Sequence, residues 1–383
     1  MQLEPTPHAL VVRLRHILGG LAILSTAACS TPARLPSAAA RPQYLYAVNP
    51  GSDDVSVYRI DARTGALTQV PGSPFATGNA NSIAVTPNGA FAYVTSFFGG
   101  TIAAYRIDAG TGRLSPIPGS PFGTGSQASN LAMTPSGTFA YVASEYSNTL
   151  SAYRIDAATG ALSPIPGSPF PVASGAMLVR IDPAGSFVYV LSEQGYDGIV
   201  SIFSIDAATG ALTPASKQPL DMHSPVRSIT ISPSGAFAYM VAGKRILVCR
   251  INRATGALTQ IPENQVAAAK DLYSVTLNSA GTVAYVANFY SGVSVYRISQ
   301  STGGFTEIPG GPFTVGSGED AGLALDSTGT FVYQGGAGHS LGAARVNPTT
   351  GRLIPIPGSP FAAGVNPHAL AVVQSGASSP PRP

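Results

Sequence analysis

The sequence predicts an all-β protein, a seven-bladed β-propeller whose blades each contain four antiparallel strands. The first observation is a phrase of the form D-A-x-T-G-A-L-[ST]-x-I-P-G-S-P-F, which recurs seven times at intervals of 46 to 50 residues. The second is that short apolar runs alternate with Gly and Pro turns inside each interval, as in propeller blades. A Thr-Gly pair marks each copy: Thr64-Gly65, Thr111-Gly112, Thr159-Gly160, Thr209-Gly210, Thr255-Gly256, Thr302-Gly303 and Thr350-Gly351.

The second repeat shows how one blade is expected to form. Alternating or apolar segments predict strands at Ser82–Thr86, Ala90–Thr95, Thr101–Ile107 and Arg113–Ile117, with Gly and Pro turns between them. The segment Pro118–Phe122 follows the fourth strand. Because proline is excluded from central strands, we expect this segment to link one blade to the next.

The two ends of the repeat array predict a closed ring over residues 44–374. Tyr44–Val48 matches the second strand of a blade, and no first strand precedes it. Ala369–Val373 matches a first strand, and no second strand follows it. We therefore expect the C-terminal strand to complete the N-terminal blade, which removes the exposed sheet edges of an open array.

The segments outside the repeats predict export. Basic residues precede the apolar stretch 17–24, and the small residues 25–28 lead to Cys29, so residues 1–29 have the pattern of an export signal. The placement of Cys29 resembles the bacterial lipoprotein signal, which implies lipidation of that cysteine. We expect a cell-envelope lipoprotein, periplasm-facing or at the outer membrane, or a secreted protein if Cys29 is not lipidated. Residues 30–43 are predicted to be a Pro/Ala/Ser-rich tether and 375–383 a disordered tail.

Composition argues against a nucleic-acid partner and against a disulfide framework. Charged residues make up only 10% of the chain, the net charge is +3 and there is no Lys/Arg run, so nucleic acid is not expected as a partner. Cys249 is the only cysteine inside the ring, which leaves no disulfide framework and predicts a small buried side chain. No cofactor is predicted, and the ring is expected to be a monomer.

Residues that recur in every repeat are predicted to be structural. Arg106 and Asp108, like their equivalents in other repeats, lie two apart on one strand face and predict an ion pair or a solvated face. Recurring tyrosines such as Tyr93 and Tyr141 predict packing within or between blades.

The repeats resemble the bacterial seven-bladed propellers with YVTN-type repeats and the related lactonase-type propellers, a group that includes 6-phosphogluconolactonase. The resemblance rests on the pattern S-P-x-G-x-x-x-Y-V, as in Pro87–Val94 and Pro135–Val142, followed by an apolar strand ending in Y-R-I-D. It covers the whole ring and implies the propeller fold and a lactonase activity. The histidine-rich segment before one inner strand of that family corresponds here to Gly175–Val179, which contains no histidine.

Positions that vary between the repeats point to one mouth of the central channel. The residue just before each first strand differs in every repeat: Asn81, Ser129, Met177, Arg227, Tyr273, Ala321 and His368. Because the innermost strands begin there, these side chains should gather at one end of the channel. Nearby segments add four acids: Glu145, Glu193, Asp271 and Asp320. Such a mixture of charged, polar and aromatic groups suits a small polar ligand.

Arg180 lies on an inner strand at a position where the other repeats have Ala or Thr. A cation there must reach the channel or pair with an acid. A pair with Asp182 or Glu193 and a role in ligand binding are both open at this point.

The main functional prediction is an exported, lipid-anchored scaffold that binds a small polar ligand or another envelope protein. The ligand-binding candidates are Asn81, Glu145, Arg180, Tyr273, Asp271 and Asp320. The alternative is a lactonase, with His368 or Glu193 as general base and Arg227 or Arg180 stabilising the oxyanion. A cation held by the four acids is a third possibility, but their spacing does not bring them together, so no metal is predicted.

Overall fold

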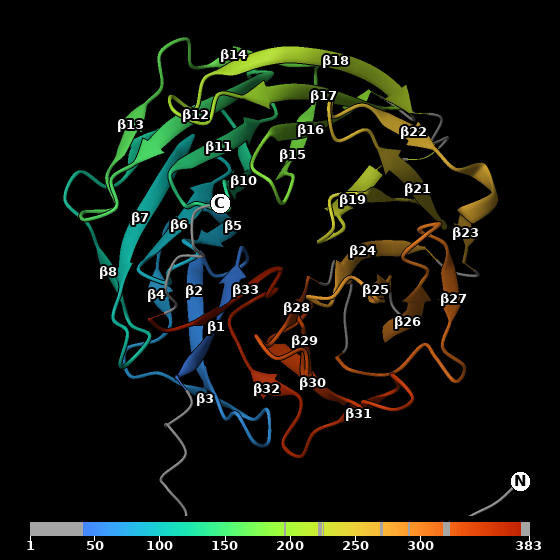
Figure 1. Ribbon diagram of the computed structural model, residues 1–383. Coiled ribbons are helices and arrows are strands. Elements are labelled where there is room, and N and C mark those ends of the chain that lie inside the picture. The colour runs from blue at the N-terminus through green and yellow to red at the C-terminus, as the bar shows by residue number, and fades with distance from the viewer. Residues whose placement is uncertain are drawn as a thin grey trace, which may run out of the picture. The chain divides into compact units, whose positions relative to one another are not determined.

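The computed structural model describes residues 41–194, 197–220, 224, 226–268, 271–289, 292–316 and 322–376. Residues 41–376 form seven sheets arranged as a ring (Figure 1). The one helical segment of the described part is a short turn, η1, at Pro262–Asn264, and no described helix has the length and apolar character needed to cross a membrane. The prediction of an all-β, seven-bladed propeller is therefore confirmed. Residues 1–40, with Cys29 and most of the predicted tether, and the tail from 377 lie outside the described residues.

Each blade consists of four antiparallel strands, and in five blades a two-residue strand also pairs with the third strand. The first blade contains β33 (Ala369–Gln374), β1 (Gln43–Asn49), β2 (Asp54–Ile60), β3 (Leu67–Gln69) and β4 (Phe75–Ala76). The second contains β5 (Ala80–Val85), β6 (Phe91–Ser96), β7 (Thr101–Ile107), β8 (Leu114–Pro116) and β9 (Phe122–Gly123). The third contains β10 (Ala128–Met133), β11 (Phe139–Ser144), β12 (Thr149–Ile155), β13 (Leu162–Pro164) and β14 (Phe170–Pro171).

The remaining four blades follow the same order around the ring. The fourth contains β15 (Ala176–Ile181), β16 (Phe187–Gln194), β17 (Asp197–Ile205) and β18 (Leu212–Leu220). The fifth contains β19 (Val226–Ile231), β20 (Phe237–Ala242), β21 (Arg245–Ile251), β22 (Leu258–Gln260) and β23 (Val266–Ala267). The sixth contains β24 (Leu272–Leu277), β25 (Val283–Asn288), β26 (Gly292–Ile298) and β27 (Phe305–Glu307). The seventh contains β28 (Leu323–Leu325), β29 (Phe331–Gln334), β30 (Ser340–Val346), β31 (Leu353–Pro355) and β32 (Phe361–Ala362).

The ring closes as the ends of the repeat array predict. β33, the last strand of the chain, pairs antiparallel with β1, the first, with Val372 opposite Leu45 and Ala371 opposite Tyr46. The two strands lie side by side in Figure 1, although they come from opposite ends of the chain. Apolar side chains of neighbouring blades pack together around the ring, so the core lies between the blades.

The Pro-rich phrase interrupts the outer strand, and its predicted role as the link between blades was wrong. β8 and β9 both pair with β7, one at each end, and residues 117–121 bulge out between them. The Ala104 N–H of β7 would lack a partner at this gap, but it donates to Ser120 Oγ at 2.9 Å. Three other copies of the phrase repeat the bond: Ser73 with Val57, Ser168 with Ala152 and Ser359 with Ala343. The serine of G-S-P therefore completes the hydrogen bonding of the third strand.

The recurring Thr-Gly pair holds neighbouring blades together. Gly160 has φ +78°, and a Cβ at this position would lie 2.4 Å from a ring carbon of Phe91 in the preceding blade. Its carbonyl accepts a hydrogen bond from the Tyr93 hydroxyl at 2.8 Å. The same tyrosine-to-glycine bond recurs in three other pairs: Tyr46 with Gly112, Tyr141 with Gly210 and Tyr333 with Gly65. The prediction that the repeated tyrosines pack within or between blades is confirmed, since all of them are buried and several bond to the next blade.

The recurring Arg and Asp have separate partners and do not form the ion pair considered for them. The Arg106 guanidinium carbon lies 4.8 Å from the centre of the Phe91 ring, and its Nη2 donates to Ala158 O in the next blade. Asp108 accepts hydrogen bonds from the hydroxyl and the N–H of Thr111, which lower the pKa of its carboxyl. Cys249 is buried, and desolvation raises the pKa of its thiol to about 12, which confirms an unreactive packing residue.

Candidate functional site

The side chains at the channel mouth are aimed by β-bulges. The pairing of the first strand with the second shifts between Ala80 and Ser82, and again at the same place in blades three to six. The skipped residue is the variable one in each case: Asn81, Ser129, Met177, Arg227 and Tyr273. A bulge takes a side chain out of the regular alternation of a strand and re-aims it. The positions that vary between repeats are therefore those that the fold frees from packing.

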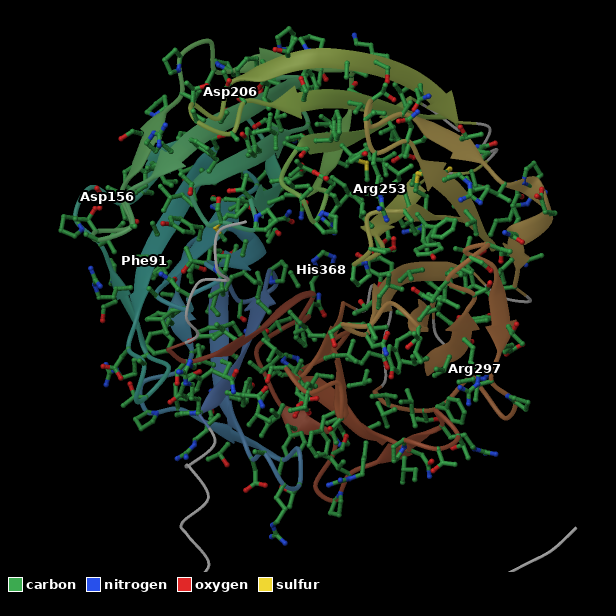
Figure 2. The ribbon with its side chains drawn as sticks, in the orientation of Figure 1. Phe91, Asp156, Asp206, Arg253, Arg297 and His368 are labelled. Atoms are coloured by element: carbon green, nitrogen blue, oxygen red, sulfur yellow. The ribbon has the colours of Figure 1, made fainter. Side chains whose placement is uncertain are left out.

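The centre of the candidate site is a pair formed by Tyr273 and His368. His368 lies just before β33, and its N–H donates to Val48 O at 2.9 Å, which fixes the backbone of this residue. The Tyr273 hydroxyl lies 2.6 Å from His368 Nε2, within hydrogen-bond distance. Tyr273 comes from the sixth blade and His368 from the first, and Figure 2 shows His368 at the central opening of the ring. The bond holds the imidazole against the phenol.

His368 opens onto a cavity of about 310 Å³. Its walls are Pro50, Asn81, Gly336, Ala337, Asn366, Pro367 and His368. The cavity thus offers an imidazole and two amide side chains beside small and apolar groups. A concave site with few polar groups is typical of a small-molecule site.

Arg227 extends the polar surface along the same mouth. Its side chain is exposed, and the guanidinium carbon lies 5.2 Å from the centre of the Phe289 ring. The Phe289 ring in turn lies 6.4 Å from the ring of Tyr273. Arg227 and His368 therefore belong to one surface, joined by two aromatic side chains.

Two acids complete this surface on the side of Arg227. Partial burial raises the pKa of Glu193 by desolvation, the positive charge of Arg227 acts in the opposite direction, and the negative charge of Glu145 raises the pKa further. Glu145, Glu193 and Arg227 are thus close enough to influence one another electrostatically. A carboxyl with a raised pKa at this mouth is a candidate acid or base.

The charges around Glu193 predict opposite effects of two substitutions on its pKa. Glu145→Gln removes a negative neighbour and is expected to lower it, whereas Arg227→Ala removes a positive neighbour and is expected to raise it. Because the folded-state pKa lies above the unfolded value, this group favours the folded state fully below its unfolded pKa, and that contribution is lost as pH rises through the folded pKa. NMR titration of the Glu193 carboxyl carbon measures both shifts, and shifts of the same sign in both variants would contradict this arrangement.

The other predicted site residues lie around this mouth or are not among the described residues. The Asn81 amide donates to Ser129 O, next to the cavity. Asp271 has an exposed side chain, and its carbonyl accepts from the Phe289 N–H at 2.8 Å. Asp320 and Cys29 lie outside the described residues. Among the residues that the structure describes, no three His, Cys, Asp or Glu side chains are grouped closely enough to hold a metal ion.

Arg180 does not pair with either acid considered for it. Its Nη1 donates to Asn130 Oδ1 at 2.7 Å and to Val179 O at 2.8 Å. Asp182 instead accepts from the N–H groups of Ser186 and Phe187. Of the two alternatives left open by the sequence, the ion pair does not form: Asp182 is used in a turn, and the partners of Arg180 are an amide and a carbonyl oxygen.

The sequence did not predict three residues of the cavity wall or the contact between Tyr273 and His368. Pro50, Gly336 and Ala337 line the cavity from loops that carry no chemical motif. The pair of Tyr273 and His368 joins residues 95 positions apart in the chain. The only available signal was that both belong to the set of variable residues before the first strands.

The chain matches the model of a known protein family. A family model described as lactonase, 7-bladed beta-propeller, matches residues 37–167 and 80–270, which together make up more than half of the chain. No curated protein matches the chain.

Solved structures share the fold at low sequence identity. A putative 6-phosphogluconolactonase from Bacteroides fragilis is 18% identical, with a TM-score of 0.76 over 88% of this chain and 99% of the other. A periplasmic gluconolactonase from Pseudomonas aeruginosa is 19% identical, with a TM-score of 0.73 over 87% of this chain and 99% of the other.

The family match overturns the main functional prediction. A lipid-anchored scaffold for a ligand or an envelope protein was the first choice, because the histidine-rich segment of lactonase-type propellers is missing at Gly175–Val179. The match points instead to a lactonase-type propeller, the alternative. The scaffold prediction was wrong because it relied on the absence of histidine from one segment of one blade.

Proposed function

Because the chain belongs to the family of seven-bladed β-propeller lactonases, we propose that it hydrolyses a lactone at the mouth that holds His368. The observation that carries the proposal is the Tyr273–His368 pair beside a cavity of about 310 Å³. An imidazole held by a hydrogen bond and facing a small cavity is a suitable general base near neutral pH.

In the proposed reaction, the Nε2–H of His368 donates to the Tyr273 hydroxyl oxygen, and Nδ1 takes a proton from a water molecule while the water oxygen attacks the carbonyl carbon of the lactone. Tyr273 holds the imidazole through its hydroxyl and keeps it oriented as it gains charge. The tetrahedral intermediate then collapses: the ring C–O bond breaks, and the proton held by His368 passes to the leaving alkoxide. The product is a hydroxy acid, and the imidazole returns to its neutral form.

Three side chains support the developing negative charge in this proposal. The Asn366 and Asn81 amides lie in the cavity wall, where an N–H group can donate to the carbonyl oxygen as it becomes an oxyanion. Arg227 lies farther along the mouth and adds positive potential that favours an anionic transition state.

The structural neighbours support the choice of substrate class. One is named a putative 6-phosphogluconolactonase and another a periplasmic gluconolactonase. We therefore propose a sugar-derived lactone, a small polar molecule, as the substrate of this chain. The test is proton release measured at constant pH with a panel of aldonolactones and phosphorylated aldonolactones. Turnover above the rate in buffer supports the proposal, and absence of turnover for every member of the panel contradicts it.

We also propose that the protein is exported and lipidated at Cys29, on the sequence pattern alone. Cells that express the full-length chain and are fed a labelled fatty acid are expected to incorporate label into the wild type and not into Cys29→Ser. Equal labelling of both, or of neither, would contradict lipidation at Cys29.

A further inference from the structure

Arg180 occupies a special place among the innermost strands. The residue opposite the recurring tyrosine of the second strand is small in the six other blades: Ala84, Ala132, Thr230, Thr276, Ala324 and Ala371. In the fourth blade this residue is Arg180, opposite Tyr189. Arg180 is thus a long, charged side chain at a strand position where the equivalent residues of the six other blades are short.

The guanidinium of Arg180 lies at the channel edge of its blade. β15 pairs only with β16, so its other edge is the free inner edge of the sheet. The Val179 N–H donates to Asn130 Oδ1 and the Val179 carbonyl accepts from Arg180 Nη1, which places both groups on that free edge. Because the inner edge faces the axis of the ring, Arg180 folds back along the wall of the channel. Arg180 itself is partly exposed to solvent, as are its equivalents Ala84, Ala132, Thr230 and Thr276.

The hydrogen bonds of Arg180 leave one edge of its guanidinium available. Nη1 has two N–H groups, and both have acceptors, Asn130 Oδ1 and Val179 O. No acceptor among the described residues contacts Nε or Nη2, whose N–H groups form the planar fork that binds oxyanions with two parallel hydrogen bonds.

No described carboxylate compensates this charge. Desolvation alone lowers the pKa of Arg180, whereas the pKa of Glu193 responds to Arg227 and not to Arg180. A partly desolvated cation without a counter-charge is unfavourable unless an anion joins it. The hydrogen bonds that Nη1 donates to Asn130 Oδ1 and Val179 O also orient the guanidinium, so its open edge is positioned at small cost in side-chain entropy.

We propose that the channel wall binds a small oxyanion, a phosphate or a carboxylate, at the Nε–Nη2 edge of Arg180. This site is separate from the proposed general base, since it lies on the fourth blade and three residues into the strand from the bulge at Met177. Its occupant neutralises Arg180, whose hydrogen bond to Asn130 already joins the inner strands of the third and fourth blades. Binding here does not require hydrolysis.

The test is the thermal stability of the purified full-length protein in inorganic phosphate and in gluconate, each compared with chloride at equal ionic strength. A ligand that binds only the folded state raises Tm by mass action. Arg180→Ala is expected to fold, because alanine occupies the equivalent position in four blades, and to weaken anion binding by roughly tenfold or more. Arg180→Lys keeps the charge but loses the fork, so intermediate binding is expected. Arg245→Ala removes an exposed arginine elsewhere and is the matched control.

A Tm increase from phosphate, from gluconate or from both that disappears in Arg180→Ala and persists in Arg245→Ala supports the site and identifies which oxyanion fits it. No increase with either anion, or an increase retained in Arg180→Ala, would overturn the proposal. Neither result depends on lactone turnover, so anion binding at Arg180 is tested independently of the proposed activity.

Discussion

Replacing His368 with alanine is expected to lower kcat for lactone hydrolysis by about 10²- to 10⁴-fold, the usual contribution of a general base. His368 is only partly buried, and its backbone contact with Val48 does not need the side chain, so the variant should keep its fold. Steady-state kinetics with the best lactone of the panel, together with the thermal unfolding curve, measure both properties. An active His368→Ala would show that another group is the base.

Tyr273→Phe separates the role of the hydrogen bond from that of the imidazole. It removes one hydroxyl and leaves the ring contacts with His368 and Phe289. We expect a smaller loss of kcat than in His368→Ala, accompanied by a shift of the pH profile, because the phenol no longer holds the imidazole. A fall in kcat without any change in the pH profile would show that Tyr273 contributes only packing.

Gly160→Ala is expected to produce a large loss of stability, about 2 to 4 kcal/mol. The left-handed conformation at φ +78° costs an L-residue about 1–2 kcal/mol, and the added methyl group would sit 2.4 Å from Phe91, which requires movement of a packed ring. The effect comes from the interface of two blades, so it should appear in unfolding of the whole ring. Urea unfolding, with the midpoint and the slope both recorded, measures it.

Gly123→Ala is the matched control for this prediction. Gly123 lies on β9 in the same region of the ring, has no left-handed φ, and has open space where a Cβ would stand. We expect its stability to stay within about 0.5 kcal/mol of the wild type. Equal stability of Gly160→Ala and Gly123→Ala would contradict the role assigned to the Thr-Gly pair.

The fold was predictable because the Thr-Gly pair recurs in all seven repeats. A Cβ at each of these glycines would crowd a neighbouring side chain, and in four blade interfaces the glycine carbonyl also accepts a hydrogen bond from a tyrosine hydroxyl. The outer strand was less predictable. The bond from Ala104 N–H to Ser120 Oγ is a local solution that a pattern of apolar residues does not reveal, so the Pro-rich phrase was misread as a link.

The sequence predicted where the site lies, but not the contacts between its side chains. Variation between repeats located Arg227, Tyr273 and His368 at one mouth, but it did not reveal that bulges aim the side chains or that Tyr273 meets His368. Such contacts join different blades, and their geometry depends on the diameter and twist of the closed ring. The same limit explains Arg180, whose partner is the amide of Asn130 and not a nearby acid in the sequence.

The most direct test of the proposed activity is proton release from a lactone panel at constant pH by the wild type and by a His368→Ala, Arg227→Ala double variant. We predict turnover by the wild type that is lost in the double variant while the thermal unfolding transition is retained. Turnover that is equal in both proteins, or no turnover by the wild type on any lactone, would contradict a lactonase site at this mouth of the ring.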